Sequence, residues 1–172
     1  MRLLATTAIV LVLASTGAYA ADLIVDEEPV ALSSGWDGIY IGVGGHWEFD
    51  INNPVQYIGG AGIIGANVTM DTFLLGAEAY VGGQSAVGAW APFWIAGGEV
   101  RAGFLASEEF LIYASVGGEI IQGGATFWTA GGGLEFMVAD NMSVDLEGDF
   151  VAGTAGGYQA VRLGASLNWH FD

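Results

Sequence analysis

The sequence predicts an all-β fold, an eight-stranded antiparallel transmembrane up-and-down β-barrel. Three observations lead to it. More than half of the residues (53%) are hydrophobic, yet beyond residue 20 no apolar run approaches the length of about eighteen that a spanning helix needs. Glycine occurs 29 times in 172 residues without a collagen period. Bulky apolar residues alternate with small or polar ones, which is typical of strands with different surroundings on their two faces.

The N-terminus has the features of a secretory signal peptide. Arg2 precedes a short apolar run at 3–14, and Ala-Tyr-Ala at 18–20 is a small-residue cleavage site. The apolar run is too short to span the hydrocarbon core as a helical anchor. We therefore expect cleavage after residue 20 and assign residues 1–20 to the signal peptide.

Residues 21–35 are predicted to form an acidic periplasmic linker, because the stretch contains an acidic run and Pro29 and ends in Ser-Ser-Gly. A partner-binding peptide is the alternative interpretation. The remaining residues, 36–172, are assigned to the barrel. Cysteine does not occur in the sequence, so the chain has no disulfide and no lipoprotein attachment site.

The exported chain is strongly acidic. Without residues 1–20 it keeps two basic residues, Arg101 and Arg162, against nineteen acidic ones, a formal charge of −17. Nucleic acid is excluded as a partner, because binding to phosphates needs clustered cations. Among small partners, cations fit this charge best.

Eight strand-like segments can be laid out after residue 35. In the first, Ile41 and Val43 alternate with Gly42 and Gly44, a pattern that suits lipid on one face and a lumen on the other. The connections after the second, fourth and sixth segments are the shortest, which predicts both termini on the short-turn, periplasmic side. The segments are 36–49, 55–68, 72–84, 93–106, 110–121, 126–138, 142–152 and 158–171.

Charged residues of the third to eighth segments fall opposite the bulky apolar face. Asp145, Glu147 and Asp149 share one parity of a single segment, and burying three like charges in a dry soluble core would cost several kcal/mol each. We therefore expect a hydrated or hydrogen-bonded lumen. The predicted lumenal charge network consists of Glu78, Glu99, Arg101, Glu119, Glu135, Asp145, Glu147, Asp149 and Arg162.

Aromatic residues on the bulky face gather near the segment ends, while aliphatic and small residues occupy the middle. Two aromatic belts around an aliphatic band are how a membrane barrel meets its two interfaces. The predicted aromatic girdle consists of Trp47, Phe73, Trp94, Phe104, Phe110, Trp128, Phe136, Phe150, Trp169 and Phe171.

The two ends of the predicted barrel carry a family resemblance. Residues 36–42 read Trp-Asp-Gly-Ile-Tyr-Ile-Gly, and 167–171 read Leu-Asn-Trp-His-Phe before a final Asp172. The chain resembles the small opacity/porin-like outer-membrane β-barrel proteins of alphaproteobacteria over 36–171. The resemblance implies an eight-stranded barrel like the OmpA transmembrane domain, inserted into outer-membrane lipid by the barrel-assembly machinery that recognises the last strand. It implies little about activity.

Candidate catalytic groups are few. The only histidines are His46 and His170. Ser166 shares the parity of His170, but side chains four apart on a strand are separated by roughly 13 Å, too far for a catalytic pair. The glycines at 131–133 are not followed by a helix as a phosphate loop requires. We expect no enzymatic activity, no cofactor and no metal site.

The sequence thus favours a small integral outer-membrane barrel with a structural, envelope-integrity role and an acidic, largely plugged lumen. A narrow cation-preferring pore remains the alternative use of the same lumen. The rival from a different class is a soluble, secreted lipocalin-like barrel that binds a hydrophobic ligand. Nothing in the sequence indicates an oligomeric state or a specific ligand.

Overall fold

The structure, a computed structural model, describes residues 35–89 and 91–171. The predicted signal peptide, and the linker up to residue 34, lie outside the described residues, and both stay predictions. Within the described part of the chain, no helix is long and apolar enough to cross a membrane.

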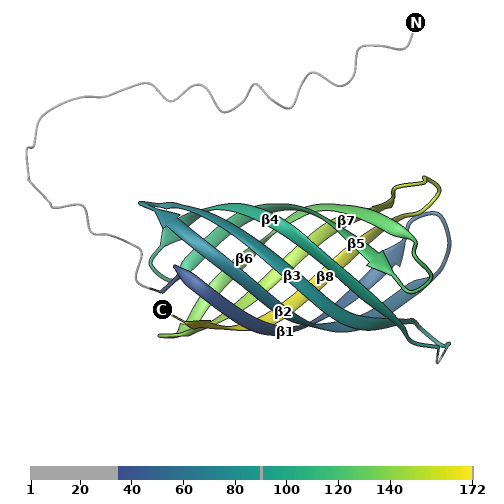
Figure 1. Cartoon of the computed structure of the whole chain (residues 1–172), viewed down its shortest axis with the longest axis horizontal. Coiled ribbons are helices and arrows are strands. Elements are labelled where there is room, and N and C mark those ends of the chain that lie inside the picture. The colour runs from purple at the N-terminus through teal and green to yellow at the C-terminus, as the bar shows by residue number, and fades with distance from the viewer. Residues whose placement is uncertain (1–34, 90, 172) are drawn as a thin grey trace, which may run out of the picture. The chain divides into compact units, whose positions relative to one another are not determined.

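Eight antiparallel strands close into a barrel in which each strand pairs with its neighbour in sequence and the first pairs with the last (Figure 1). The predicted closed barrel of eight antiparallel, sequentially paired strands is confirmed. The segments that alternate in sequence are the strands of the structure, with bounds that differ by at most two residues. The strands are β1 (Gly38–Asp50), β2 (Gln56–Met70), β3 (Phe73–Ala86), β4 (Phe93–Ser107), β5 (Phe110–Ile121), β6 (Thr126–Ala139), β7 (Met142–Gly153) and β8 (Gln159–Phe171).

The start of the first strand corrects the sequence prediction. Trp36 was expected to begin it, but the pairing of β1 with β2 begins at Gly38, opposite Asn67. Gly38 has a φ of 102°, a conformation that glycine adopts readily and residues with a Cβ do not. The chain bends there, and Trp36 leaves the wall to lie fully buried at the end of the barrel.

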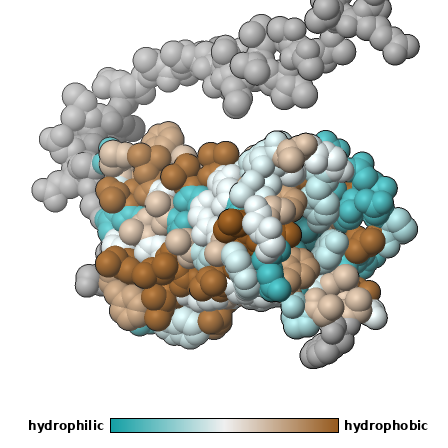
Figure 2. Space-filling model, turned by 45° about the vertical axis from the view of Figure 1, so that its right-hand side comes forward, coloured by the Kyte–Doolittle hydropathy of each residue, from teal (hydrophilic) through white to brown (hydrophobic). Residues whose placement is uncertain are grey.

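The barrel wall has an apolar outer face and a polar inner one. In β5, Ile112 and Val116 are 45% and 54% exposed, whereas Tyr113 and Ser115 between them are buried. A soluble core would bury the aliphatic set and expose the polar one. The connections after β1, β3, β5 and β7 are longer than the others, and the end of the barrel that carries them is called the long-loop end. Figure 2 shows hydrophobic residues spread over the visible side of the wall, with hydrophilic residues more frequent toward the long-loop end.

None of the ten residues of the predicted aromatic girdle is buried. Neighbouring strands bring several of them into ring contact at the two ends of the barrel. At the short-turn end Phe110 and Phe136 stack with centroids 4.6 Å apart, and at the long-loop end Trp128 and Phe150 lie 5.4 Å apart. The wall between them carries mainly aliphatic and small residues, which suits the hydrocarbon region of a bilayer.

Candidate functional site

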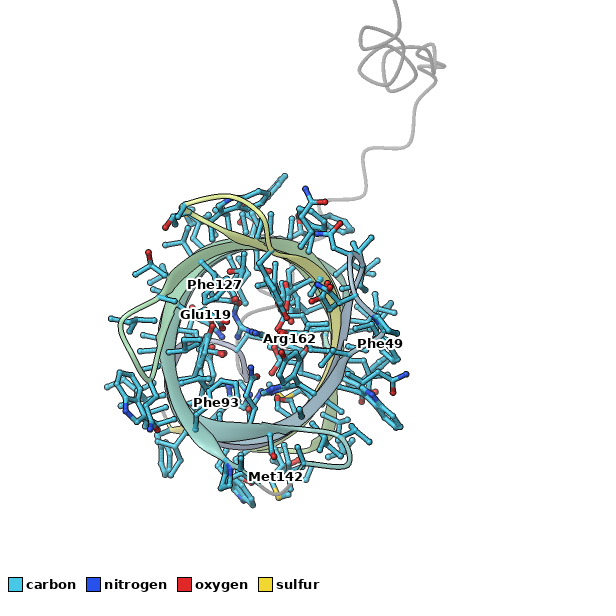
Figure 3. All side chains as sticks on the ribbon, turned by 90° about the vertical axis from the view of Figure 1, so that its right-hand side faces the viewer. Phe49, Phe93, Glu119, Phe127, Met142 and Arg162 are labelled. Atoms are coloured by element: carbon cyan, nitrogen blue, oxygen red, sulfur yellow. The ribbon has the colours of Figure 1, made fainter. Side chains whose placement is uncertain are left out.

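The candidate site is the interior of the barrel, which is filled by inward-facing side chains in four successive layers. From the short-turn end these are an apolar floor, a lower ionic layer around Arg101, an acidic chamber and an upper ionic layer around Arg162. Figure 3 looks along the barrel from the long-loop end, with Arg162 and Glu119 inside the ring of strands.

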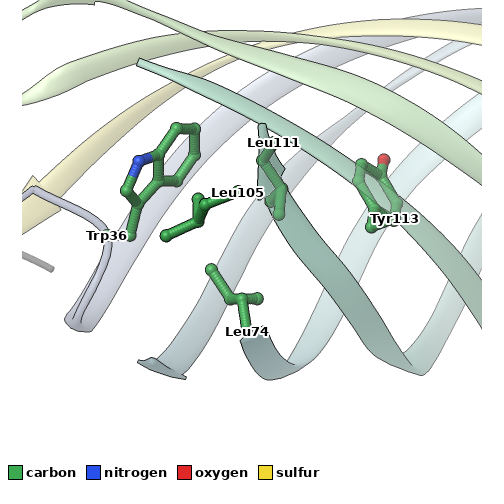
Figure 4. Close-up of a cluster of buried hydrophobic side chains, with 5 residues drawn as sticks. All are labelled: Trp36, Leu74, Leu105, Leu111 and Tyr113. Carbon is green, nitrogen blue, oxygen red and sulfur yellow. The ribbon is translucent and has the colours of Figure 1, made fainter. Parts of the chain in front are cut away.

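The floor is a cluster of buried hydrophobic side chains at the short-turn end (Figure 4). It consists of Trp36, Leu74, Leu105, Leu111 and Tyr113. The indole Nε1 of Trp36 donates a hydrogen bond of 2.8 Å to the carbonyl oxygen of Glu108, in the turn between β4 and β5. The polar atom of the tryptophan is therefore satisfied, and its ring belongs to one apolar cluster with leucines of three strands.

The lower ionic layer joins walls that are not neighbours in the sheet. Arg101 on β4 pairs with Glu135 on β6 at 3.0 Å, and its Nη2 donates to Oδ1 of Asn67 on β2 at 3.1 Å. The guanidinium carbon lies 4.9 Å from the ring centroid of Tyr40 and 5.3 Å from that of Tyr113, within cation–π range. This charge is paired, hydrogen-bonded and stacked, as a buried charge must be.

Glu135 is the acceptor at the centre of this layer. Its Oε1 receives hydrogen bonds from Ser143 Oγ and from Asn168 Nδ2, the latter at 3.0 Å. Ser143 Oγ also lies 2.8 Å from His170 Nε2. The structure thus brings His170 to Ser143, whereas Ser166, the serine considered from sequence, is hydrogen-bonded to Asn168.

The grouping of Ser143, His170 and Glu135 differs from a catalytic triad. In a triad the acid orients the histidine through the ring nitrogen that does not face the serine. Here Glu135 accepts from Ser143 itself, and its 3.7 Å contact with His170 is to the same Nε2 that faces the serine. All three side chains are buried, so the arrangement can hold the lumen together but offers no substrate access.

The upper ionic layer is organised by Arg162 on β8. Its Nη1 and Nη2 each donate to Glu119 on β5 at 2.8 Å, and its Nε donates to Glu48 on β1 at 2.8 Å. Glu48 also accepts a 2.6 Å hydrogen bond from the hydroxyl of Tyr158, which lies just before β8. Burial and the neighbouring carboxylate of Glu48 raise the pKa of the Tyr158 phenol, so it stays a donor at neutral pH.

Three tyrosines repeat one arrangement around the lumen. Each sits opposite a glycine of the next strand, where its ring occupies the space that a Cβ would fill, and its hydroxyl donates to a carboxylate one strand further on. The glycines are needed because their missing side chains admit the rings. The three sets are Tyr40–Gly65–Glu78, Tyr80–Gly97–Glu119 and Tyr113–Gly133–Asp145.

Between the two ionic layers lies an acidic chamber, a cavity of about 80 Å³. A space of this size can hold a few water molecules. Carboxylate oxygens of Glu99, Glu147 and Asp149 lie within 4.8 Å of one another, and Ser115 donates to Glu147 at 2.9 Å. The wall also includes Glu78 and Asp145.

The residues of the predicted lumenal charge network lie on the inner side of the wall, but they form two groups, the arginines with their paired carboxylates and the carboxylates of the chamber. Arg101 and Arg162 pair with Glu135 and Glu119. Among the described residues, the five carboxylates of the chamber make no ion pair within 4.0 Å of either arginine. Two arginines cannot neutralise eight inward carboxylates, so the surplus carboxyl groups of the chamber must be hydrated, protonated or bound to cations.

Sequence reasoning missed several members of the two ionic layers. Glu48 has the inward parity of Tyr40 and His46, so the alternation of β1 could have identified it. His46 lies in the same upper region and is hydrogen-bonded to Gln84 at 2.9 Å. Asn67 was hidden by the glycines of β2, which blur the alternation of that strand in the sequence.

Comparison with known proteins gives only likenesses of fold. No family model and no curated protein matches the chain, so the resemblance to the opacity/porin-like family stays a prediction. Solved structures that are similar include a de novo designed transmembrane β-barrel, at 16% identity and a TM-score of 0.48, covering 78% of this chain and 97% of the design.

Structures of a larger protein are also similar. Outer-membrane expressed OmpT of Vibrio cholerae is similar at 12% identity and a TM-score of 0.36, covering 78% of this chain and 52% of OmpT. The loop L8 deletion mutant of the same protein gives 15% identity and a TM-score of 0.34, covering 68% of this chain and 40% of the mutant. The chain therefore spans about half the length of the OmpT structures or less.

Proposed function

We propose that this chain is an integral outer-membrane β-barrel with a structural role in the cell envelope and a lumen closed to solutes. The observation that carries the proposal is Arg162, which joins Glu48 on β1 and Glu119 on β5. In a closed ring of eight strands, β1 and β5 lie opposite each other. A fully satisfied ionic layer that ties opposite walls together acts as a plug.

Membrane insertion is supported by the outer surface. Large hydrophobic residues face outward along the strands, for example Val43 at 57%, Val81 at 63% and Leu163 at 55% exposure. An exposed apolar surface that runs around the whole wall marks contact with lipid rather than water. The proposal includes export by the predicted signal peptide in a Gram-negative cell, and insertion by the barrel-assembly machinery through the aromatic end of β8.

Closure is supported by the width of the barrel and by its contents. An eight-stranded barrel has an interior just wide enough for side chains. Here the floor and both ionic layers consist of large, buried side chains, among them Trp36, Leu105 and Arg101. The chamber is the open space between them, and Arg162 is part of its lining.

Two measurements test this proposal. The protein should fractionate with the outer membrane and give a heat-modifiable band on gels. Solubility without detergent would contradict membrane insertion and favour the lipocalin-like alternative. Folded protein inserted in a planar bilayer should give no single-channel steps, and steps from the unmodified chain would contradict the closed lumen.

A narrow cation-preferring pore is the second candidate, and the acidic chamber favours it. Its wall carries carboxylates that are not paired with the arginines, so a path that opened there would select cations. This candidate predicts single-channel steps from the unmodified chain that shrink when Asp145→Asn, Glu147→Gln and Asp149→Asn are combined. Steps that keep their size in that variant would rule out a path through the chamber.

A further inference from the structure

The floor of the barrel depends on one side chain that does not belong to a strand. Trp36 precedes β1, while Leu74, Leu105 and Leu111 project from β3, β4 and β5. Trp36 is fully buried although the chain that carries it is outside the sheet. In Figure 4 its ring lies at one edge of the cluster, beside Leu105.

Trp36 reaches from one wall to the opposite one. The chain leaves Trp36 toward β1, which pairs with β2 and β8. The indole nevertheless donates its hydrogen bond to the carbonyl of Glu108, in the turn that leads into β5, and β5 is opposite β1 in the closed ring. The segment that enters β1 therefore lies across the short-turn mouth.

In the part of the chain that the structure describes, this segment is residues 35–37, and few hydrogen bonds hold it in place. Beyond the hydrogen bond of Trp36, the carboxylate of Asp37 accepts one from the backbone nitrogen of Thr69 on β2. The ladder of β1 begins only at Gly38, whose positive φ makes it a bend between the wall and the segment. Moving Trp36 out of the mouth therefore breaks two hydrogen bonds and apolar contacts but no strand pairing.

We infer that Trp36 is a removable stopper, and that the segment entering β1 opens or closes the short-turn mouth while the wall stays folded. The stopper touches the next layer as well, because its indole meets the ring of His170 edge-on with centroids 5.8 Å apart. This movement is additional to the proposed closed lumen, because the ion pairs of Arg101 and Arg162 involve no residue of the segment.

Thiol labelling tests the inference on the full chain, which has no cysteine of its own. Leu105→Cys places a thiol beside Trp36, and Glu109→Cys places one at an exposed position at the same end. In detergent micelles, a water-soluble maleimide should label position 105 slowly and position 109 fast. Adding Trp36→Ala should speed labelling at position 105 by about tenfold or more, because protection in a folded protein reports local opening.

Controls separate the stopper from general loosening. Trp47→Ala removes an outward tryptophan at the other end and should leave labelling at position 105 unchanged, and a heat-modifiable band shows that each variant is folded. If Trp36→Ala does not fold, Asp37→Ala decides by the same measurement, with a smaller acceleration expected. Complete resistance of position 105 to labelling with Trp36 present, or no acceleration in the folded variant, would overturn the inference.

Discussion

Arg162 and Glu119 face each other across the lumen and form a two-point ion pair, with Nη1–Oε2 and Nη2–Oε1 distances of 2.8 Å. Two parallel charge-assisted hydrogen bonds of this kind fix the relative position of both groups. The strands that carry them share no ladder, since β8 pairs with β7 and β1, and β5 with β4 and β6. The pair therefore braces the barrel from within.

Removing the arginine should destabilise the barrel strongly. Arg162→Met would leave Glu119 and Glu48 buried without their cation, and breaking a buried pair in this way costs about 3–5 kcal/mol of the free energy of unfolding. Unfolding by urea in lipid vesicles measures the loss. A triple variant that adds Glu119→Gln and Glu48→Gln should recover most of it, because no uncompensated charge remains. A single variant as stable as the unmodified protein would mean that the pair is not the brace described.

The tyrosine–glycine contacts should be sensitive to a single methyl group. A Cβ at Gly97 would overlap the ring of Tyr80, so Gly97→Ala must displace that ring and its hydrogen bond to Glu119. We expect a loss of about 1–3 kcal/mol in the free energy of unfolding, as for other overpacked sites. Gly62→Ala is the matched control, because its Cβ would have its nearest neighbour, the carbonyl oxygen of Val81, at 4.0 Å. Equal stabilities of the two variants would count against a packing role for the glycine.

Neutralising one chamber carboxylate should stabilise the protein at neutral pH. Carboxylate oxygens of Glu147, Glu99 and Asp149 lie within 4.8 Å of one another, and two unit charges at that separation repel by about 3 kcal/mol at an effective dielectric of 20. Glu147→Gln keeps an acceptor for Ser115 and removes the repulsion of Glu147 with both neighbours, while that between Glu99 and Asp149 remains. Its unfolding midpoint in urea should rise at pH 7, and the gain should shrink at acidic pH, where the carboxylates of the unmodified chain are protonated. A lower midpoint at pH 7 would show that the charge is compensated in the folded protein.

The sequence predicted the wall better than its contents, for a physical reason. Alternation decides which face a side chain occupies, and for β5 and β7 it did so correctly. It does not give the height of a side chain along the barrel, because that depends on how the tilted strands are staggered. Arg162 lies directly opposite both Glu48 and Asp149 in the ladders. Of these two neighbours it bonds Glu48, and its second partner, Glu119, lies across the lumen.

Trp36 shows a second limit of the sequence prediction. Its place before an alternating segment favoured a strand, and the positive φ of Gly38 that turns it inward leaves no trace in the alternation. Glycine at this position is compatible with both a strand and a bend. The floor of the barrel could therefore not be predicted from the pattern of apolar residues alone.

A charge on the outer wall should distinguish a membrane barrel from a soluble one. Val100 lies at the middle of β4 and is 57% exposed. If lipid covers it, Val100→Arg should lower the free energy of unfolding in vesicles by about 2–4 kcal/mol, the cost of arginine at the middle of a bilayer. Ile51→Arg is the matched control, because Ile51 is also 56% exposed but lies just beyond β1 in the connection to β2, where water or headgroups can solvate the charge. A barrel that met water on its outer face would tolerate both substitutions equally, and that result would rule out the proposed membrane location.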